Sequence, residues 1–330
     1  MFDIQYHQEK LSQYSFLITG GAGFIGSNLV EYLIKHKANR VVVLDNLSNG
    51  FQENIKEFFN KPNFEFIQGD IVDYKTCLKA CKDIDYVSHQ AALGSVPRSI
   101  TNPIATNEAN VTGFLNMLNA AKEQGIKRMV YASSSSVYGD HPSLPKKEEN
   151  IGKPLSPYAV SKYTGELYGE VFYKSYGFET VGFRYFNVFG PKQNPNLAYS
   201  AVIPLFAKAL LTNQSPKIFG DGKQARDFTF IENVVQANIK ALFSTHPLLP
   251  GSILNIGNNK STSILQLVEK ISILLNVDIP LIHHPPRQGD VRNSLADITR
   301  AEELIGYKPA FTFEDGLRIA IKYYQKQNHS

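Results

Sequence analysis

The sequence has 330 residues, of which 43% are hydrophobic and 19% are charged, as in an ordinary soluble globular protein. Its formal net charge of +4 is spread along the chain without a basic block, so we expect no nucleic-acid partner. No run of about 18 apolar residues occurs, and the polar N-terminus lacks the apolar core of a signal peptide. We therefore expect no membrane association and a cytoplasmic location.

The cysteines and histidines give no sign of a metal site. Cys77 and Cys81 lie four residues apart in a predicted helix, without a second ligand pair for zinc and without a disulfide framework. His89 is better explained as a packing or cofactor-side residue, and the pair at 283–284 has no acidic partner at ligand spacing. We expect no metal.

In chain order, short apolar segments alternate with helical patterns over the first half. Apolar residues recur at helical spacing between 29 and 34, and another helical pattern covers residues 110–125. This alternation predicts an α/β fold, a doubly wound parallel sheet with helices on both faces. The predicted strands lie in SFLITG (15–20), RVVVLDN (40–46), FEFIQGD (64–70), YVSHQAA (86–92), RMVYASSS (128–135) and TVGFRYFNVFG (180–190).

The pattern changes after about Gly190, where a turn-rich loop leads into a region with many prolines. Helical patterns persist at AVIPLFAKALL (201–211) and SILQLVEKISILL (263–275). We expect a larger Rossmann domain over residues 1–190 and a smaller α/β domain mainly over residues 191–330. A return of the segments around 228–256 to the first domain stays open.

The segment TGGAGFIG follows the first predicted strand and opens the first predicted helix. Gly20, Gly23 and Gly26 permit a tight turn and let a pyrophosphate approach the N–H groups at the helix start. Asp45 ends the second strand, where a carboxylate can accept hydrogen bonds from an adenosine ribose and repel a 2′-phosphate. The pattern favours NAD over NADP, with a capping aspartate as the alternative for Asp45.

The segment SPYAVSKYTGELYGEVFYKSYG (156–177) is predicted as a helix, with Ser156 as its cap and Pro157 in its first turn. Tyr158 and Lys162 lie four residues apart and share one face. An ammonium nearby would lower the pKa of the phenol, so that Tyr158 could take a proton from a substrate alcohol. Alone this spacing is weak, because the chain has 17 tyrosines. It gains weight from the glycine motif upstream.

TGGAGFIG, SSSSVYG, SPYAVSKY and RYFNVFGP, in this order, resemble the extended short-chain dehydrogenase/reductase superfamily over essentially the whole chain. QAALGSVPRSI, YGDHPSLPKKEENIGKPLSPYAVSKY and GDVRNSLAD are similar to the UDP-hexose 4-epimerases, particularly those that accept N-acetylated sugars. The resemblance implies NAD bound by residues 1–190, a UDP-sugar bound mainly by residues 191–330, a homodimer and a role in polysaccharide biosynthesis. The cofactor-binding residues would be Gly20, Gly23, Phe24, Ile25, Gly26, Asp45, Asn46, Asp70, Ile71, Ala91, Ala92, Asn110, Tyr158 and Lys162.

The run SSSSVYG carries hydroxyls where related dehydratases and decarboxylases carry an acidic residue. A dehydratase uses that carboxyl group to expel the 6-hydroxyl after oxidation at C4, and Ser134, Ser135 and Ser136 offer no such acid. We therefore predict that the hydride simply returns, which is epimerase chemistry. The resemblance implies Ser134, Tyr158 and Lys162 as catalytic residues, with Ser134 bonding the sugar O4 and Tyr158 acting as base and then acid.

The resemblance places the UDP contacts in the second half of the chain. Arg226 and Arg292 resemble pyrophosphate-binding arginines, with ion pairs as the alternative, and Phe219 would lie against uracil or in the core. Ser294 lies where glucose-restricted enzymes carry a tyrosine, which leaves room for a 2-acetamido group. The substrate-binding residues would be Gly94, Ser134, Ser135, Ser136, Tyr158, Asn187, Gln193, Ala201, Val202, Phe219, Arg226, Arg292 and Ser294.

The leading hypothesis is reversible NAD-dependent C4 epimerisation of UDP-N-acetylglucosamine (UDP-GlcNAc) to UDP-N-acetylgalactosamine (UDP-GalNAc) through a 4-keto sugar. One alternative substrate is a UDP-uronic acid, UDP-GlcNAcA or UDP-GlcA, which needs a cation such as Arg98 or Lys192; another is UDP-Glc/UDP-Gal. A dehydratase or decarboxylase is disfavoured by the missing acid. A non-catalytic NAD-binding regulator would not need Ser134, Tyr158 and Lys162 together.

Overall fold

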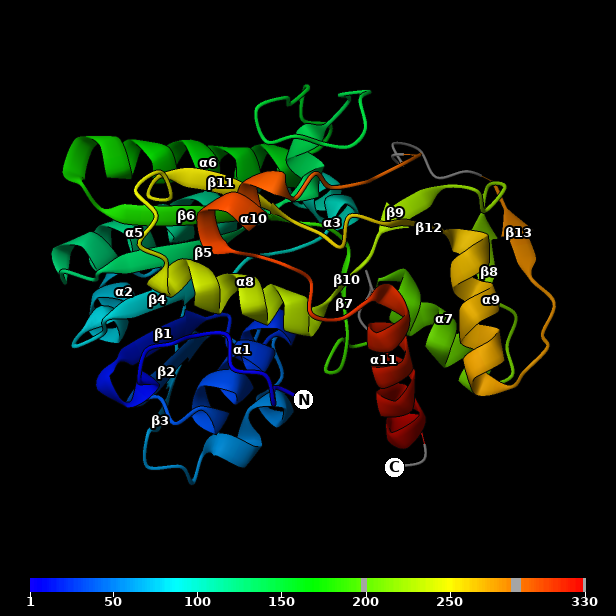
Figure 1. The fold of residues 1–330 in the computed structure, drawn as a ribbon, viewed down its shortest axis with the longest axis horizontal. Coiled ribbons are helices and arrows are strands. Elements are labelled where there is room, and N and C mark those ends of the chain that lie inside the picture. Colours follow the sequence, from blue (N-terminus) through cyan, green and yellow to red (C-terminus); the bar gives the residue numbers. More distant parts are fainter. Residues whose placement is uncertain (197–200, 286–291, 329–330) are drawn as a thin grey trace.

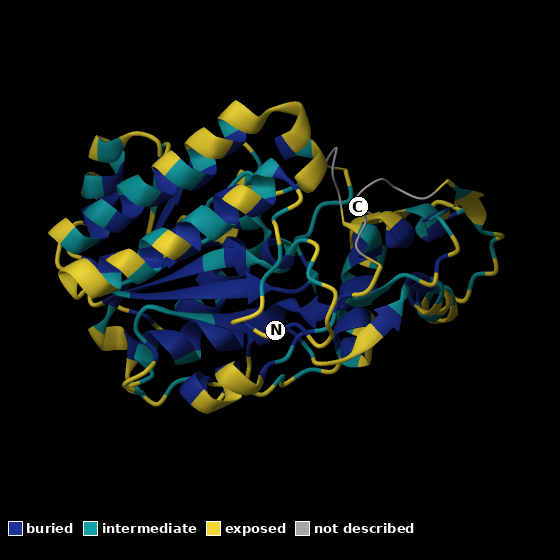
Figure 2. Ribbon diagram, turned by 90° about the horizontal axis from the view of Figure 1, so that it is seen from above, coloured by how far each residue is buried: buried dark blue, intermediate teal, exposed yellow. Residues whose placement is uncertain are grey.

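The computed structural model describes residues 1–196, 201–285 and 292–328. A larger lobe is built on a seven-stranded sheet, and a smaller lobe lies beside it (Figure 1). The arrowheads of the strands point toward the smaller lobe (Figure 2), so the carboxyl ends of the sheet face the junction of the two lobes. Ligands of open parallel sheets bind outside the carboxyl ends of the strands. A ligand-binding site is therefore expected at the junction of the two lobes.

The large sheet is parallel throughout, with the strand order β11-β6-β5-β4-β1-β2-β3. All five residues of β1 are buried, as expected of a strand covered by helices on both faces. Its strands are β1 (Ser15–Thr19), β2 (Arg40–Asp45), β3 (Phe64–Gln68), β4 (Tyr86–His89), β5 (Arg128–Ser134), β6 (Glu179–Tyr185) and β11 (Ser252–Ile256).

Helices cover both faces of this sheet. One face carries α2 (Tyr74–Cys81), α5 (Gly113–Glu123) and α6 (Pro157–Tyr176), and the other carries α1 (Phe24–Lys35) and α8 (Ile231–Phe243). Their buried sides form two hydrophobic cores, one on each face. Their outer sides are exposed (Figure 2). The short helices α3 (Val96–Thr101) and α4 (Pro103–Asn107) lead through a π-helical turn, Glu108–Thr112, into α5.

The smaller lobe combines helices with short strand pairs. Strand β8 pairs with β13, β9 pairs with β12, and β7 pairs with β10 where the two lobes meet. The strands are β7 (Val188–Phe189), β8 (Lys217–Phe219), β9 (Ala225–Asp227), β10 (Thr229–Phe230), β12 (Ser261–Ser263) and β13 (Ile282–His284). The helices are α7 (Val202–Leu211), α9 (Ile264–Leu275) and α11 (Phe313–Asn328), whereas α10 (Thr299–Ile305) packs against β11 and α8 of the larger lobe (Figure 1).

The predicted α/β fold class is confirmed, and each of the six predicted segments contains a strand. The last of them holds two strands, β6 and β7. The strand is interrupted before Val188 because Asn187 has a φ of 29°, which is incompatible with a continuous strand. Strand β11 is not among the predicted strands, since SILNI is short and its alternation is weak.

Within the described ranges, no helix has the length and apolar character needed to cross a bilayer. The same ranges hold no group of three or more His, Cys, Asp or Glu side chains that could bind a metal.

Candidate active site

The turn between β1 and α1 brings the backbone close to the end of a neighbouring strand. Gly20 has a φ of +66°, and a Cβ there would lie 2.7 Å from the Ala91 nitrogen. A Cβ on Gly26 would overlap the carbonyl oxygen of Gly20. Helix α1 begins at Phe24 with Gly23, which has no side chain, at its N-cap. The turn therefore presents a bare helix N-terminus that suits an anion.

A cavity of about 560 Å³ lies at the carboxyl ends of β1, β2, β3 and β4 and is partly closed by residues of the smaller lobe. Most of the predicted cofactor residues line it. The lining includes Gly20, Gly23, Phe24, Ile25, Gly26, Asp45, Asn46, Asp70, Ile71, Ala91 and Ala92, together with three predicted substrate residues, Gly94, Gln193 and Ala201.

Backbone groups fix the Asp45 carboxylate at the edge of this cavity. It accepts hydrogen bonds from the amides of Ala22, at 2.9 Å, and Leu47, at 2.8 Å. Burial raises the pKa of Asp45, although these bonds act in the opposite direction. Asp70 is held similarly, by the Asn46 side chain at 2.8 Å and the Val72 amide at 2.9 Å. Both carboxylates are thus ordered before any ligand arrives.

Asn110 lies in the π-helical turn and is not part of the cavity lining. Its side chain accepts from the Leu93 amide at 2.7 Å and donates to the Leu93 carbonyl at 3.2 Å. It also donates to the Ser161 hydroxyl at 3.1 Å. Asn110 therefore connects the loop at residues 91–94, which lines the cavity, with α6. Its place in the structure suits positioning of the loop more than direct contact with a cofactor.

The end of β5 and the first turns of α6 bring Ser134, Tyr158 and Lys162 together. The Lys162 Nζ donates to the Ala132 carbonyl at 2.8 Å and lies 5.9 Å from the centre of the Tyr158 ring. Ser156 caps α6 by accepting from the Ala159 amide at 3.1 Å, which fixes the start of the helix as predicted. Ser135 and Ser136 form a 3₁₀ turn directly after β5, and the Ser136 amide donates to the Ser134 hydroxyl at 3.1 Å.

Burial dominates the acid–base properties of this group. It raises the pKa of Tyr158 above its ordinary value, although the hydrogen bond with Ser134 acts in the opposite direction. Burial also lowers the pKa of Lys162 to about 8, against the raising effect of Glu166. The expected lowering of the tyrosine pKa by the lysine is therefore not seen in the protein alone, where Ser134 supplies the lowering effect and burial outweighs it. A base at this position needs a further positive charge beside the phenol.

Glu166 is a residue of this region that the sequence did not single out. It lies one turn after Lys162 on the buried side of α6 and forms an ion pair with Arg184 of β6 at 2.8 Å. It also accepts a hydrogen bond from the hydroxyl of Ser133. Its i, i+4 spacing from Lys162 is the feature of the sequence that could have placed Glu166 on the same helix face as Lys162. The pair anchors α6 against β5 and β6 beneath the candidate catalytic residues.

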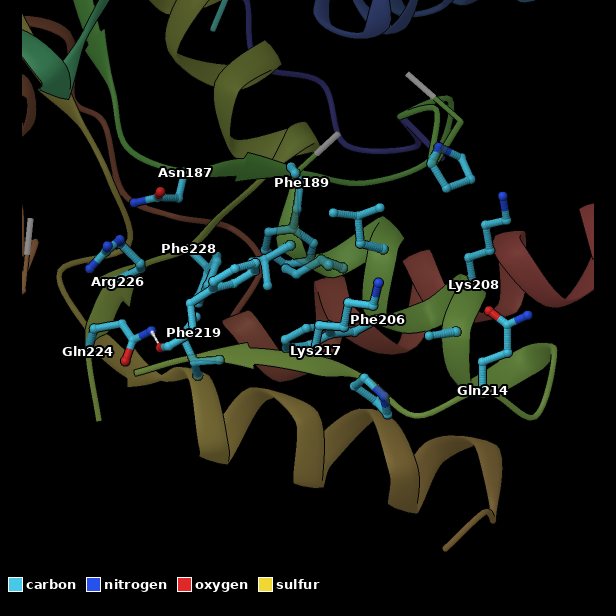
Figure 3. A pocket seen from close by; sticks show the side chains of 18 of the residues that line it. Asn187, Phe189, Phe206, Lys208, Gln214, Lys217, Phe219, Gln224, Arg226 and Phe228 are labelled. Atoms are coloured by element: carbon cyan, nitrogen blue, oxygen red, sulfur yellow. Dashed lines mark hydrogen bonds between the residues drawn. The ribbon is translucent and has the colours of Figure 1, made fainter. Parts of the chain in front are cut away.

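A second cavity, of about 580 Å³, lies in the smaller lobe (Figure 3). Asn187 and Arg226 lie at one end, near Phe219, and Lys208 and Gln214 lie at the other. The predicted residues Asn187, Ala201, Val202, Phe219 and Arg226 all line it. Ala201 lines both cavities, so the two adjoin there.

Arg292 and Ser294 lie beside this cavity without lining either one. The Arg226 side chain donates to the Arg292 carbonyl at 3.2 Å, and the Ser294 amide donates to the Ala225 carbonyl at 3.1 Å. The Arg292 side chain is 74% exposed and pairs with Asp221 at 3.3 Å. The GDV turn at residues 289–291, used to align Ser294, lies outside the described residues.

The NAD dependent epimerase/dehydratase family matches residues 16–257, the span that holds every strand of the large sheet apart from the first residue of β1. The chain belongs to this family. NAD is accordingly its cofactor. The predicted resemblance is thereby confirmed.

Individual relatives are similar over nearly their whole length. A putative UDP-glucose 4-epimerase of Methanocaldococcus jannaschii is 39% identical, with 95% of this chain and 99% of that protein covered. The solved UDP-N-acetylglucosamine 4-epimerase from Methanobrevibacter ruminantium, in complex with UDP-N-acetylmuramic acid, is 42% identical with a TM-score of 0.90, covering 95% and 99%. The UDP-glucuronic acid 4-epimerase from Bacillus cereus, in complex with UDP-glucuronic acid and NAD, is 31% identical with a TM-score of 0.88, covering 95% and 99%.

The first cavity fits this cofactor in two respects. The glycine turn and bare start of α1 suit a pyrophosphate, because a side chain at Gly20 or Gly26 would collide with the backbone. The ordered Asp45 carboxylate at the cavity edge suits a ribose diol. Lys162 of α6, whose Nζ bonds to the Ala132 carbonyl of β5, does not line this cavity, so its contact with the second ribose stays a prediction. Because Ala201 lines both cavities, a ligand in the second cavity would lie next to a cofactor in the first.

Proposed function

We propose that this enzyme is a UDP-sugar 4-epimerase that interconverts UDP-GlcNAc and UDP-GalNAc through a 4-keto sugar. The observation that carries the proposal is that Ser134, Tyr158 and Lys162 converge at the carboxyl end of β5, beside the strand β4 whose carboxyl end borders the first cavity. The two cavities share Ala201, so a dinucleotide in the first and a UDP-sugar in the second would lie next to each other, although the three side chains line neither cavity. The similarity to sugar-nucleotide 4-epimerases along almost the whole chain supports the same activity.

In the proposed mechanism Tyr158 takes the proton of the sugar O4 hydroxyl, and Ser134 bonds that oxygen and relays the proton. NAD, when bound, would supply the acceptor and donor of the C4 hydride and a positive charge near the phenol. That charge favours the phenolate, which Tyr158 needs because burial raises its pKa. Tyr158 then returns the proton to O4 as an acid. Lys162 holds the ribose and adds its own charge to the site.

Inversion at C4 requires the keto sugar to turn while the UDP stays bound. Arg226 and Arg292 would hold the pyrophosphate with Asn187 on its phosphate side, and Phe219 would pack against uracil. The remaining predicted contacts, Gly94, Ser135, Ser136, Gln193, Ala201, Val202 and Ser294, would form the walls around the sugar. Small side chains predominate among them, which leaves the sugar free to turn.

Elimination is disfavoured because no carboxyl group in the serine run can act as an acid. The nearest carboxylate identified on α6, Glu166, is buried and engaged with Arg184 and Ser133. Both of its oxygens have partners, so it is not available to protonate a leaving hydroxyl. This supports epimerase over dehydratase or decarboxylase chemistry. Retention of Ser134, Tyr158 and Lys162 likewise disfavours a non-catalytic regulator.

Two observations favour an N-acetylated sugar. Ser294 is a small residue beside the sugar pocket, and the relative with 42% identity is a UDP-GlcNAc 4-epimerase. The uronic-acid alternative loses one of its two candidate cations, because Lys192 pairs with Glu31 at 2.8 Å. Arg98 lines the cofactor cavity and bonds to Asn49 at 2.6 Å. The ion pair of Lys192 and the position of Arg98 in the cavity proposed for NAD disfavour both side chains as selectors of a C6 carboxylate.

We also propose a homodimer formed through α6. Val160, Leu167 and Val171 recur on one face of this helix and are 47–52% exposed, opposite the face that carries Lys162 and Glu166. An apolar stripe of this kind suits the same stripe on a second copy. Light scattering after gel filtration tests this: a dimeric mass that Leu167→Lys reduces to a monomeric one supports it, and a monomeric wild type contradicts it.

The decisive experiment incubates purified enzyme separately with UDP-GlcNAc, UDP-Glc, UDP-GlcA and UDP-GlcNAcA and follows products by NMR. Formation of UDP-GalNAc from UDP-GlcNAc supports both the chemistry and the sugar. Turnover of UDP-Glc alone keeps the chemistry and contradicts the N-acetyl pocket. Turnover of the uronates alone contradicts the argument from Lys192 and Arg98. No product from any of them, with NAD bound and the protein folded, contradicts the proposed function.

A further inference from the structure

Asp227, the last residue of β9, is a fully buried carboxylate that neither the predicted site nor the proposed mechanism uses. Its Oδ1 accepts from the Asn258 amide at 2.7 Å, and its Oδ2 accepts from the amides of Asn259 and Ala296, each at 3.1 Å. These donors belong to two separate stretches of chain. Burying a carboxylate is costly unless it makes such bonds, so a carboxylate in this place connects segments that would otherwise separate.

One of these stretches is the segment 292–297, which carries Arg292 and Ser294. The Ala225 amide donates to the Arg292 carbonyl at 2.9 Å, and the Ser294 amide donates back to the Ala225 carbonyl at 3.1 Å. The backbone groups of residues 292, 294 and 296 that make these hydrogen bonds all lie on the edge of the segment that faces β9. The Asp227 side chain continues this row of hydrogen bonds: its carboxylate accepts from the Ala296 amide, two residues beyond Ser294. On the other edge, Lys146 pairs with the backbone of residues 295 and 297.

The other stretch is the loop after β11, at the edge of the large sheet. Gly257 makes the approach possible, because a Cβ there would lie 2.9 Å from the Asp227 Oδ2 and 2.5 Å from the Ala296 Cβ. The carbonyl of Asp227 also accepts from the Asn187 side chain at 3.2 Å. Through its carboxylate and its backbone, Asp227 is thus connected to both lobes at the place where the UDP contacts are proposed.

We propose that Asp227 is a positioning residue that sets the affinity of the site for the UDP part of its substrate. It fixes the spacing of Arg226 and Arg292 to each other and to Asn187, and it holds Ser294 against β9. Paired arginines bind a pyrophosphate well only when their forks are held at a fixed separation. Asp227 itself touches no substrate, and its role rests on the proposed function of the cavity.

The test measures UDP binding to NAD-loaded enzyme by calorimetry, which needs no turnover. Asp227→Asn replaces one acceptor by an amide that faces N–H donors, so at least one of the three bonds is lost. We expect UDP to bind about tenfold to a hundredfold more weakly, with kcat at saturating substrate and NAD content within about twofold of the wild type. Glu232→Gln is the control, because Glu232 is an equally buried carboxylate whose partners are Tyr6 and the N-terminal backbone.

A second variant covers the case in which Asp227→Asn does not fold. Gly257→Ala keeps the carboxylate but displaces Ala296, and the same loss of UDP affinity is expected. A dissociation constant unchanged within about twofold in the folded variant, or an equal loss in Glu232→Gln, overturns the positioning role. A wild type that binds NAD but no UDP would instead contradict the proposed function, and the role of Asp227 would fall with it.

Discussion

Mild acid should destabilise the protein through His89, and a substitution there should remove this effect. His89 ends β4 with 3% of its surface exposed, and its Nδ1 lies 2.8 Å from the Thr19 hydroxyl. Its ring packs against Phe114 with the ring centres 5.4 Å apart. Burial, together with the nearby Lys162 ammonium, lowers the pKa of His89 from 6.5 to about 3. The folded protein therefore keeps this imidazole neutral at any pH in ordinary use.

The sign of the effect follows from proton uptake. In the unfolded chain His89 binds a proton near pH 6.5, whereas in the folded protein it does so only near pH 3. The unfolded state thus binds more protons between these values, so this contribution to stability is complete above pH 6.5 and is lost as the pH falls. At about pH 5, about 1.5 pH units below the pKa of the unfolded chain, the free energy of unfolding is lower by about 2 kcal/mol.

Urea unfolding followed by circular dichroism, at about pH 7 and about pH 5, measures this loss in wild type and His89→Asn. The asparagine keeps a group that can bond to Thr19. Its packing defect is the same at both pH values and cancels in the comparison. Asp227, whose pKa burial raises to about 6, contributes with the opposite sign in both proteins and also cancels. A pH-dependent loss equal in the two proteins, within about 0.5 kcal/mol, would refute the reasoning.

Three further substitutions test the site. Tyr158→Phe should abolish turnover while NAD stays bound, since only the proton-transferring hydroxyl is removed; NMR assay showing near-normal turnover would contradict the mechanism. Ser294→Tyr should fill the 2-acetamido space and reduce kcat/KM for UDP-GlcNAc at least tenfold relative to UDP-Glc, by about 1.4 kcal/mol; an unchanged ratio would count against this pocket. Glu166→Gln leaves Arg184 buried without its counter-charge and should lower the free energy of unfolding by about 3 kcal/mol; an unchanged urea midpoint would contradict the anchoring role of the pair.

Local sequence patterns predicted the larger lobe well because each of its strands and helices has a recognisable pattern within its own residues. A strand buried on both faces is apolar along its length, and β1 is buried at every residue. Ser156 and Pro157 mark the start of α6 in the sequence, and the cap is formed in the structure. The glycine turn is also predictable from the sequence, because Gly20 has a positive φ and lies so close to the Ala91 backbone that a side chain would not fit.

The sequence could not predict interactions between distant residues that carry no local pattern. Glu166 meets Arg184 across two elements, and Asp227 meets Ala296 from 69 positions away. Neither residue type signals its partner, since an acidic residue on a helix or at a strand end is usually solvated. The loss of the expected lowering of the Tyr158 pKa has the same origin. Spacing predicts that Lys162 is near, but the burial that raises the pKa of Tyr158 depends on packing that spacing does not show.

The division of labour between the lobes follows from the chemistry that an epimerase has to perform. The proposed proton-transferring groups lie on β5 and α6, and the buried pair Glu166–Arg184 connects α6 with the large sheet. The proposed UDP contacts sit on short strands of the smaller lobe, which have few neighbours of their own and depend on Asp227 for their spacing. Strong binding of UDP and a loosely held sugar can then be adjusted separately, because different side chains control them. An enzyme of this design could change its sugar at Ser294 while the residues that move the proton stay the same.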